Sequence, residues 1–463
     1  ILLIIATISG VRLIHDENYA KYTVNYVSSF ARTLKKVMYN YEKDYDFDHK
    51  LVIVGRDGRE VSEHYVTHVI QTLLAYDYQI EYIDIVPTPT VQQTVQLHKA
   101  AGAVIITASH NGNEWCGLKF LNPSSIFFSP DECSILFSDL QNEPPFKSLP
   151  LEQLSFKNTS NHKILIEHFE HVQNCKIIEA DKIRSKRFKV AFNGQCASGA
   201  VYAPILANFL NFDLFLFNST VGVLPKNPEP TPANLKDFQS FLSNKQFDVG
   251  FAVDPDADRL VLTDEMGNLI NEELTLTICL KYFLSKQPLE KFVRNCSSSF
   301  ATSLIDANVQ VYESKVGEVN VALEMIRQNA QLGGEGNGGV ILKEAHLGRD
   351  SIVGVMMILS YLAESGLKMS QLIAQIPKMV IQKEKYAYEK DQKEQIMGKI
   401  EKIQLNGFEV SKLDGVKLVN AELKQWVQIR FSNTEHIFRI IAEAPTSVET
   451  QELIKKVEEI VLV

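Results

Sequence analysis

The stretch Ala103-Val104-Ile105-Ile106-Thr107-Ala108-Ser109-His110-Asn111 is the most informative part of the sequence about the fold class. Its four apolar residues predict a buried strand, and the polar residues that follow predict a tight turn at the end of that strand. Packing holds a hydroxyl at such a turn in place while it still faces solvent. In an open α/β sheet this is where a nucleophile or a phosphoryl carrier lies. Ser109 is therefore the first candidate site residue.

On both sides of this stretch, short apolar runs alternate with helical patterns. A helix is expected at 65–74, and strands are expected at 51–54, 80–85 and 103–106. The rhythm returns at 188–192, 213–217 and 249–253, and a third time at 259–263, 292–295 and 310–313. This alternation is typical of βαβ units and a largely parallel sheet.

Two proline-containing segments are expected to be connectors. Asn142 to Ser148 is a candidate domain boundary, and Lys226 to Pro232 is expected to be a loop inside a domain. After about residue 370 the pattern changes to a charged helical stretch at 383–402, short strands and a last helix at 448–461. The sequence thus predicts α/β domains at 1–150, 151–260 and 261–370 and a smaller C-terminal α+β domain at 371–463.

Length and composition narrow the function. A chain of 463 residues is too long for one core, and a net charge of -9 with dispersed Lys and Arg argues against nucleic acid or an anionic membrane as partner. The six cysteines form no CxxC pair, so we expect reduced packing residues and no zinc site. The apolar Ile1 to Ala6 lacks the basic start of a signal peptide and is far shorter than the roughly 20 residues of a membrane span. A buried first strand and a cytoplasmic protein are expected.

An acidic loop follows the expected strand that ends at Val253. Asp254, Asp256 and Asp258 place three carboxylates at alternate positions, a set of oxygen ligands that suits a hard divalent cation such as Mg²⁺. The spacing also begins an EF-hand, but Arg259 stands where that loop requires glycine, and strands are expected on both sides. A solvated acidic turn is the alternative for this loop taken alone.

A glycine-rich run, Gly333-Gly334-Glu335-Gly336-Asn337-Gly338-Gly339, contains a formal GxGxxG pattern. A dinucleotide fold would require a strand before it and a helix opening within it, and the surrounding sequence predicts neither. We therefore expect a mobile loop whose Glu335 and Asn337 can hydrogen-bond sugar hydroxyls. A plain glycine turn is the alternative.

Two further features are cationic. Arg430 to Glu435, followed by Arg439, gathers guanidinium, hydroxyl and amide donors near a turn, which suits a phosphate group, although an exposed polar hairpin would look the same. Lys119 alternates with Leu118 and Phe120, so the lysine is expected on the opposite strand face, toward the serine turn if its strand returns beside it.

Taken together, these loops resemble those of the α-D-phosphohexomutases, whose members include phosphoglucosamine mutase, phosphomannomutase and phosphoglucomutase. The phosphoserine, metal, sugar and phosphate loops of that family occur in the same order at 107–111, 254–259, 334–339 and 430–439. The resemblance spans nearly the whole chain. It implies three related α/β domains and a C-terminal domain of another type around a central cleft.

The resemblance also implies an activity and a set of roles. A hexose 6-phosphate and a hexose 1-phosphate would be interconverted through phosphorylated Ser109 and a hexose 1,6-bisphosphate, which would also serve as activator. Mg²⁺ would be held by phosphorylated Ser109 with Asp254, Asp256 and Asp258. Lys119 would act as general acid/base, with His110, Arg259 and Arg12 supporting the transferring group. The sugar phosphate would be bound by Glu335, Asn337, Lys315, Gly317, Arg430, Ser432, Asn433, Thr434 and Arg439. A monomer or homodimer is expected.

The chain departs from the family pattern at several positions. Many members have histidine at the position of Gly339 and serine at that of Asn337, and an arginine–glycine loop where Arg12 here runs straight into Leu13-Ile14-His15. The motif variants favour phosphoglucosamine mutase, with phosphomannomutase or phosphoglucomutase as alternatives, because such sugars differ by one or two hydrogen bonds. A non-catalytic phosphosugar-binding relative and a phosphatase with Asp254 as nucleophile also stay open.

Overall fold

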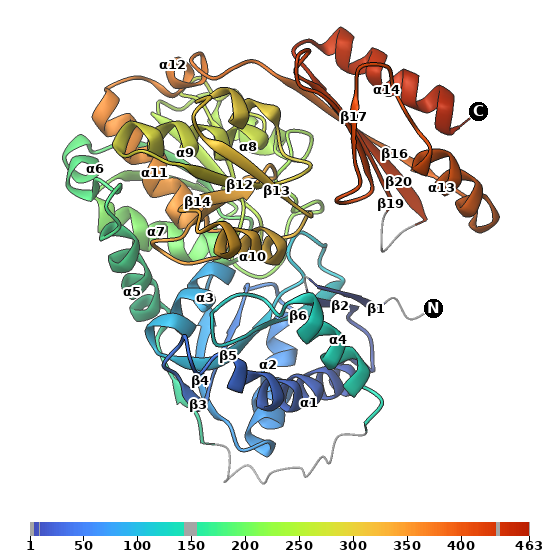
Figure 1. The fold of residues 1–463 in the computed structure, drawn as a ribbon. Coiled ribbons are helices and arrows are strands. Elements are labelled where there is room, and N and C mark those ends of the chain that lie inside the picture. Colours follow the sequence, from blue (N-terminus) through green and yellow to red (C-terminus); the bar gives the residue numbers. More distant parts are fainter. Residues whose placement is uncertain (1–3, 9, 143–154, 432–435, 463) are drawn as a thin grey trace.

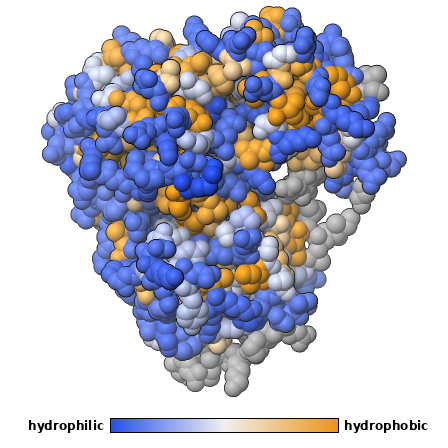
Figure 2. All heavy atoms as spheres, in the orientation of Figure 1, coloured by the Kyte–Doolittle hydropathy of each residue, from blue (hydrophilic) through white to orange (hydrophobic). Residues whose placement is uncertain are grey.

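A computed structural model describes residues 4–8, 10–142, 155–431 and 436–462. It shows three α/β units followed along the chain by a C-terminal unit of a different kind (Figure 1). This arrangement confirms the predicted fold class. Figure 2 shows a recess on one face of the molecule, between the C-terminal unit and the first α/β unit.

The first unit is built on a mixed sheet with strand order β1-β2-β6-β5-β3-β4-β7. Strands β3, β4, β5 and β7 pair in parallel, and β1, β2 and β6 are antiparallel to their neighbours. The strands are β1 Ile4–Thr7, β2 Gly10–Ile14, β3 Asp48–Arg56, β4 Gln79–Ile85, β5 Ala100–Ile106, β6 Trp115–Leu121 and β7 Lys157–Asn158. The helices are α1 Tyr19–Val37, α2 Ser62–Ala75, α3 Thr88–Leu97 and α4 Pro130–Asp139, with the 3-10 turn η1 Met38–Asn40.

The second and third units repeat one pattern, in which three parallel strands carry one antiparallel edge strand. Their orders are β11-β10-β8-β9 and β13-β12-β14-β15. The strands are β8 Lys189–Asn193, β9 Asp213–Phe217, β10 Val249–Val253, β11 Leu260–Thr263, β12 Lys291–Asn295, β13 Gln310–Ser314, β14 Leu332–Glu335 and β15 Gly339–Leu342. The helices are α5 Asn161–Gln173, α6 Ala180–Lys186, α7 Ser198–Leu210, α8 Lys236–Leu242, α9 Glu273–Lys286, α10 Glu318–Gln328, α11 Ser351–Ser365 and α12 Met369–Ile373, with η3 Phe300–Leu304.

The C-terminal unit is an antiparallel sheet of order β16-β20-β19-β18-β17 packed against helices. Its strands are β16 Val380–Ala387, β17 Glu409–Ser411, β18 Val416–Asn420, β19 Gln425–Phe431 and β20 Ile437–Ala444. Its helices are α13 Lys393–Glu401 and α14 Ser447–Val461, with η4 Lys390–Gln392. A capping box formed by Thr446 and Glu449 begins α14, which contains the predicted last helix at 448–461.

The apolar core is divided unevenly. One cluster runs from the first unit through the second and third, and includes Ile53, Phe169 and Met357. The C-terminal unit keeps a cluster of its own, which includes Leu418, Ile440 and Val457. Among the described residues, no helix is long and apolar enough to cross a bilayer.

Several sequence-based predictions are wrong in detail. The strand β1 is half-exposed rather than buried because it lies at the edge of its sheet. The strand at 260–263 belongs to the second sheet and not to the third. Residues 383–387 are part of β16 rather than of a charged helix, since their backbone pairs with β20.

The glycine-rich run is also ordered differently from the prediction. Gly333 to Glu335 lies in β14, and Gly339 begins β15, so the run is a buried hairpin and not a loop. Gly334 has a φ of +156°, and a Cβ there would lie 2.1 Å from the Gly339 carbonyl oxygen. The glycines thus allow two backbones to approach closely. The predicted connector at 142–148 lies outside the described residues after Asn142, and 226–232 forms no helix or strand, as predicted.

Candidate functional site

Ser109 lies on the turn after β5, where a φ of +51° places it in the left-handed region. Its amide donates to Thr107 Oγ1 at 2.8 Å, and its hydroxyl donates to Asp254 Oδ2 at 3.2 Å. The side chain therefore projects from the first unit toward the acidic loop of the second. Tertiary contacts hold a backbone conformation that a serine rarely adopts.

A buried ion pair that the sequence analysis missed holds this turn. Arg59 is fully buried, pairs with Asp57 at 2.8 Å, and donates to the carbonyl oxygens of Ser109 at 2.6 Å and Trp115 at 2.8 Å. Asp57 also accepts the Thr107 hydroxyl at 2.7 Å. The signal was available, because both residues follow β3, which is the parallel neighbour of β5, and the carboxyl ends of parallel strands meet at one edge.

The acidic triplet follows β10 and is completely buried. One oxygen from each of Asp254, Asp256 and Asp258 lies within 4.8 Å of the other two. Asp256 Oδ2 accepts hydrogen bonds from Lys119 Nζ at 2.6 Å and Thr88 Oγ1 at 2.8 Å. Asp256 Oδ1 and Asp258 Oδ1 are buried, and no residue that the structure describes donates a hydrogen bond to either oxygen. Convergent buried carboxylate oxygens that lack donors fit a hard cation such as Mg²⁺.

The electrostatics of the triplet agree with this fit. Burial, followed by the charges of Asp258 and Asp256, raises the pKa of Asp254 well above its usual range. Burial also acts to raise the pKa of Asp256, but Lys119 outweighs it and the pKa is lowered. Burial lowers the pKa of Lys119, but Asp256 and Asp258 outweigh it and raise the pKa. Without further positive charge the cluster favours a proton on Asp254, and a divalent cation would take the place of that proton.

The basic side chains predicted to support the site lie beside Ser109. His110 Nδ1 is 3.3 Å from Ser109 Oγ and 3.2 Å from Arg259 Nη2. Burial, and then the charges of Arg259 and Arg12, lower the pKa of His110 well below its usual value, so the imidazole is neutral at pH 7. Arg12 donates weakly from Nε to the Ala108 carbonyl at 3.5 Å. It lies on β2, which runs through Leu13 and Ile14 without a loop.

The sugar-loop residues are placed by the β14–β15 hairpin. Glu335 is buried and accepts hydrogen bonds from Asn295 Nδ2 at 2.7 Å and from the Gly317 amide at 2.8 Å. Asn337 is half-buried and accepts from the Gly339 amide at 3.2 Å. The structure thus brings Gly317 to Glu335, whereas the Lys315 side chain is exposed.

A second residue that the sequence analysis missed joins these loops. Arg349 is buried, and its guanidinium contacts Asp258 at 2.6 Å, Glu335 at 2.5 Å and Glu318 at 3.2 Å. Burial lowers the pKa of Arg349, but these carboxylates outweigh it and hold the pKa well above its usual value. The Gly-Arg-Asp sequence before an apolar run predicts that Asp350 caps a helix, as it caps α11, but no local pattern indicates what Arg349 contacts.

The predicted phosphate-binding arginines lie on neighbouring strands of the C-terminal unit. Arg430 and Arg439 are paired across β19 and β20. Arg430 Nη1 is 3.0 Å from Asp414 Oδ2, which also accepts the Val316 amide at 3.0 Å. This carboxylate connects the C-terminal unit to the loop that carries Gly317. The predicted residues Ser432, Asn433 and Thr434 lie outside the described residues.

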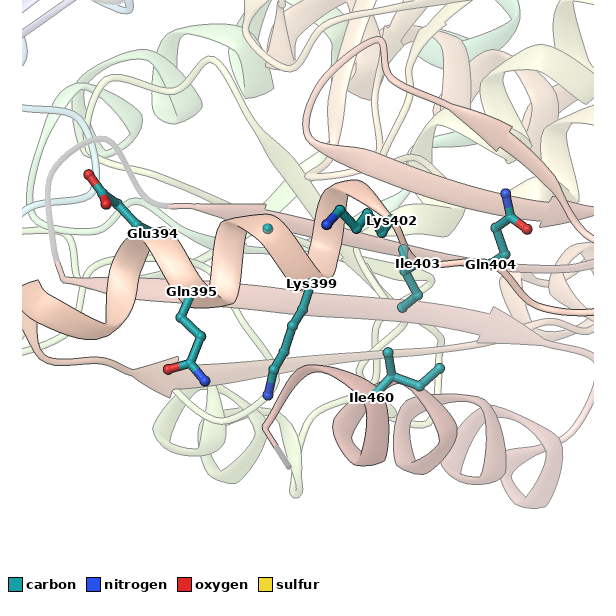
Figure 3. A pocket seen from close by; sticks show the side chains of 8 residues that line it. Glu394, Gln395, Lys399, Lys402, Ile403, Gln404 and Ile460 are labelled. Carbon is teal, nitrogen blue, oxygen red and sulfur yellow. The ribbon is translucent and has the colours of Figure 1, made fainter.

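A separate groove of about 600 Å³ lies in the C-terminal unit between α13 and α14 (Figure 3). Its lining consists of Glu394, Gln395, Gly398, Lys399, Lys402, Ile403, Gln404 and Ile460. It contains none of the residues that the sequence analysis singled out, and the arrangement around Ser109 is the stronger candidate site.

Known proteins share the domain organisation of this chain. The chain matches three domains described as phosphoglucomutase/phosphomannomutase alpha/beta/alpha domains I, II and III, over residues 7–144, 166–267 and 271–380. A phosphoglucomutase/phosphomannomutase of Thermococcus kodakarensis is 30% identical over 412 residues, which are 88% of each chain. A phosphoglucosamine mutase of Methanocaldococcus jannaschii is 30% identical over 425 residues, 88% of this chain and 91% of the relative.

A solved structure shares the fold. The crystal structure of a putative phosphomannomutase from Thermus thermophilus superposes with a TM-score of 0.82 at 20% sequence identity. The match covers 100% of this chain and 99% of that one, so the similarity includes the C-terminal unit as well as the three α/β units.

Proposed function

Because the chain belongs to the α-D-phosphohexomutase family, we propose that it interconverts a hexose 6-phosphate and a hexose 1-phosphate through phosphorylated Ser109. The observation that carries the proposal is the 3.2 Å contact between Ser109 Oγ and Asp254 Oδ2. This contact joins a hydroxyl on a strand-end turn to a buried triplet of carboxylates. A phosphoryl carrier and a cation site are the two parts that such a transfer requires.

The cation site would be formed by Asp254, Asp256 and Asp258, together with an oxygen of the Ser109 phosphoryl group. When bound there, Mg²⁺ would offset negative charge on the transferring oxygens. The chain's own cations act in the same direction, because Arg259 and Arg12 lie beside the serine turn. Charge stabilisation and in-line positioning are the main sources of rate in phosphoryl transfer.

The transfer also requires two proton movements. In the forward step a sugar hydroxyl attacks phosphorus and loses its proton to a general base, while the bond from phosphorus to Ser109 Oγ breaks and Ser109 Oγ takes up a proton. Neutral His110 lies 3.3 Å from Ser109 Oγ, and because burial and the charges of Arg259 and Arg12 disfavour its protonated form, we assign it a hydrogen bond to the transferring group rather than a proton. Burial lowers the pKa of Lys119, but Asp256 and Asp258 outweigh it, so this lysine holds a proton. In the proposal Lys119 is the general acid/base. The hexose 1,6-bisphosphate then returns its other phosphoryl group to Ser109, so no phosphate is consumed.

The predicted sugar and phosphate residues complete the proposal. Glu335 and Asn337 would contact sugar hydroxyls, with Lys315 and Gly317 on the neighbouring loop. Arg430, Ser432, Asn433, Thr434 and Arg439 would hold the phosphate that is not transferred. Guanidinium groups suit this task because either end of the sugar must be accepted in turn.

Glucosamine phosphate is the substrate that we propose first, with mannose and glucose phosphates as alternatives. The two relatives are named for different substrates, since one is a phosphoglucosamine mutase and the other a phosphoglucomutase/phosphomannomutase. A coupled assay with the three hexose phosphates, each primed with its 1,6-bisphosphate and Mg²⁺, tests the choice. The proposal expects turnover with glucosamine phosphate at the highest kcat/KM, and loss of turnover in Ser109→Ala. Binding of all three sugars without any turnover would instead identify a non-catalytic phosphosugar-binding protein.

A further inference from the structure

We propose that Arg349 is a positioning residue that couples the cation site to the sugar site. It would hold Asp258 in place for the cation and Glu335 in place for the sugar, so that occupation of one site changes affinity at the other. The inference rests on the proposed function, because that function assigns the roles of Asp258 and Glu335.

The contacts with the acidic triplet support the first half of this role. Arg349 Nη2 donates to Asp258 Oδ2 at 2.6 Å, whereas Asp258 Oδ1 is buried and has no donor within the described parts of the chain. Asp256 is arranged in the same way, since Lys119 and Thr88 donate to Oδ2 while Oδ1 receives no hydrogen bond from the described residues. In each case one oxygen is anchored and the other is available. Residues that anchor a ligand in this manner typically change metal affinity 10- to 100-fold when they are replaced.

The contacts on the other edge of the guanidinium support the second half. Arg349 Nη1 donates to Glu335 Oε2 at 2.5 Å, and Nε donates to Glu318 Oε2 at 3.2 Å. The three carboxylates come from the loop after β10, from β14 and from α10. Because the guanidinium is a rigid planar fork, a shift of one carboxylate moves the donors that hold the other two.

The surrounding backbone is shaped to hold this arginine. A Cβ at Gly339 would lie 2.2 Å from Arg349 Cδ, so only glycine leaves room for the arginine stem beside the sugar hairpin. This is the position at which many family members have histidine. Asp350, the residue after Arg349, is held by two buried histidines. Its Oδ2 lies 2.9 Å from His168 Nε2 and 3.0 Å from His346 Nε2. Arg349 is therefore fixed at its backbone and along its stem.

The first test replaces Arg349 by lysine, which keeps the charge and loses the fork. Titration of the unphosphorylated protein with Mn²⁺ alone, by calorimetry, reads the cation site without turnover. We expect Arg349→Lys to bind Mn²⁺ at least tenfold more weakly than the natural protein. The matched control is Arg294→Lys, a similarly buried arginine that bonds Ser299, Thr302 and Glu313, and it should bind Mn²⁺ as the natural protein does.

The second test displaces Arg349 without changing it. Gly339→Ala puts a methyl group against the arginine stem, at a position whose φ is not in the left-handed region, so the backbone tolerates alanine. We expect a loss of Mn²⁺ affinity in Gly339→Ala as well. The double variant should lose little more than Arg349→Lys alone, because both changes disrupt the same contacts.

The coupling itself is measured in Ser109→Ala protein, which cannot turn over by the proposed route. Glucosamine 6-phosphate, glucose 6-phosphate and mannose 6-phosphate are each titrated with and without Mg²⁺. We expect Mg²⁺ to change sugar affinity at least fivefold in this background, and the ratio to fall toward one when Arg349→Lys is added.

These measurements separate the inference from the proposed function. If Arg349→Lys and Gly339→Ala both bind Mn²⁺ with natural affinity and keep the natural sugar coupling, the inference is wrong even where the protein is an active mutase. If Mn²⁺ affinity falls as expected but no hexose phosphate turns over, Arg349 positions the cation site and the proposed function is wrong.

Discussion

At the scale of single residues, the chemistry proposed for Ser109 depends on buried side chains that would never touch a substrate. The Ser109 amide donates a hydrogen bond to the Thr107 hydroxyl, and that hydroxyl donates one to Asp57. Arg59 donates a hydrogen bond to the Ser109 carbonyl oxygen. This chain of contacts holds a serine at a φ of +51°. The left-handed conformation is sparsely populated by serine, so the cost is met by the contacts around it.

Arg59→Lys tests this account of the serine turn. Lysine cannot reach the carbonyls of Ser109 and Trp115 and the Asp57 carboxylate together, so the turn should shift. We expect kcat of the mutase reaction to fall by roughly 10²-fold, as misplacement of a reacting group by about 1 Å does, with KM little changed. Arg56→Lys is the matched control, since Arg56 ends the same strand but bonds Tyr82 and Asp84. Equal effects of the two substitutions on kcat would contradict the role of Arg59.

A site residue could be predicted from the sequence only where the residues next to it in the chain indicate its role. Ser109 and the aspartates at 254–258 stand at ends of predictable strands, and their residue types alone indicate chemistry. Arg349 could not be assigned in this way, because its meaning comes from three carboxylates that lie 14 to 91 residues away along the chain. A buried arginine looks like an exposed one until the fold is known.

At the scale of elements, strand ends carry the site, and strands were the most predictable elements. Apolar runs such as 103–106 and 249–253 fall inside β5 and β10, because a buried parallel strand is a continuous apolar segment. Two kinds of element escaped prediction. The glycine-rich hairpin has too few side chains to show alternation, and β16 carries charges on a partly exposed strand that read as a helix.

Glu81 lies on β4 where this strand pairs with the short strand β7, and its carboxylate is expected to contribute to the stability of the fold. Burial acts to raise the pKa of Glu81, but His98, Lys157 and Thr159 donate to it and lower the pKa to about 2. A carboxylate with a depressed folded-state pKa stabilises the fold above its unfolded pKa of about 4.3 and loses that contribution as the pH falls toward 2. Glu81→Gln should therefore cost up to about 3 kcal/mol at pH 7 and progressively less below pH 4.

Urea unfolding of the natural protein and of Glu81→Gln, at several pH values between 7 and 3, measures this difference. The two midpoints should converge as the solution becomes more acidic. The exposed Glu63→Gln is the control and should show no pH-dependent difference. A gap between the natural protein and Glu81→Gln that stays constant with pH would show that the Glu81 contacts do not act through its ionisation.

At the scale of the whole molecule, the C-terminal unit is attached differently from the other three. Its apolar cluster is its own, and polar contacts join it to the third unit. Glu443 accepts hydrogen bonds from the Phe300 amide at 2.6 Å and from the Ser299 hydroxyl, and Lys417 pairs with Glu313 at 2.8 Å. Polar interfaces of this kind permit relative domain motion. The predicted phosphate-binding arginines therefore lie on the unit that is held by the more adjustable contacts.

Glu443→Gln should loosen this attachment. In this variant the NH₂ group of glutamine would face N–H and O–H groups that donate to the natural carboxylate. The lost hydrogen bond should weaken the attachment by about 2 kcal/mol. We expect a larger radius of gyration by small-angle X-ray scattering and a KM for the phosphosugar raised by roughly tenfold, the factor that 1.4 kcal/mol gives. Glu458→Gln is the matched control, because Glu458 bonds Tyr386 within the C-terminal unit. A natural radius and KM in Glu443→Gln would show that Glu443 does not secure the attachment.

The whole proposed reaction depends on the Ser109 hydroxyl as carrier of the phosphoryl group. Intact-protein mass spectrometry of the natural protein and of Ser109→Ala, before and after incubation with hexose 1,6-bisphosphate and Mg²⁺, measures this directly. The natural protein should gain the mass of one phosphoryl group, located on Ser109 by peptide analysis, and Ser109→Ala should gain none. Mutase turnover by Ser109→Ala, or a phosphoryl group on Asp254 instead, would show that Ser109 is not the carrier.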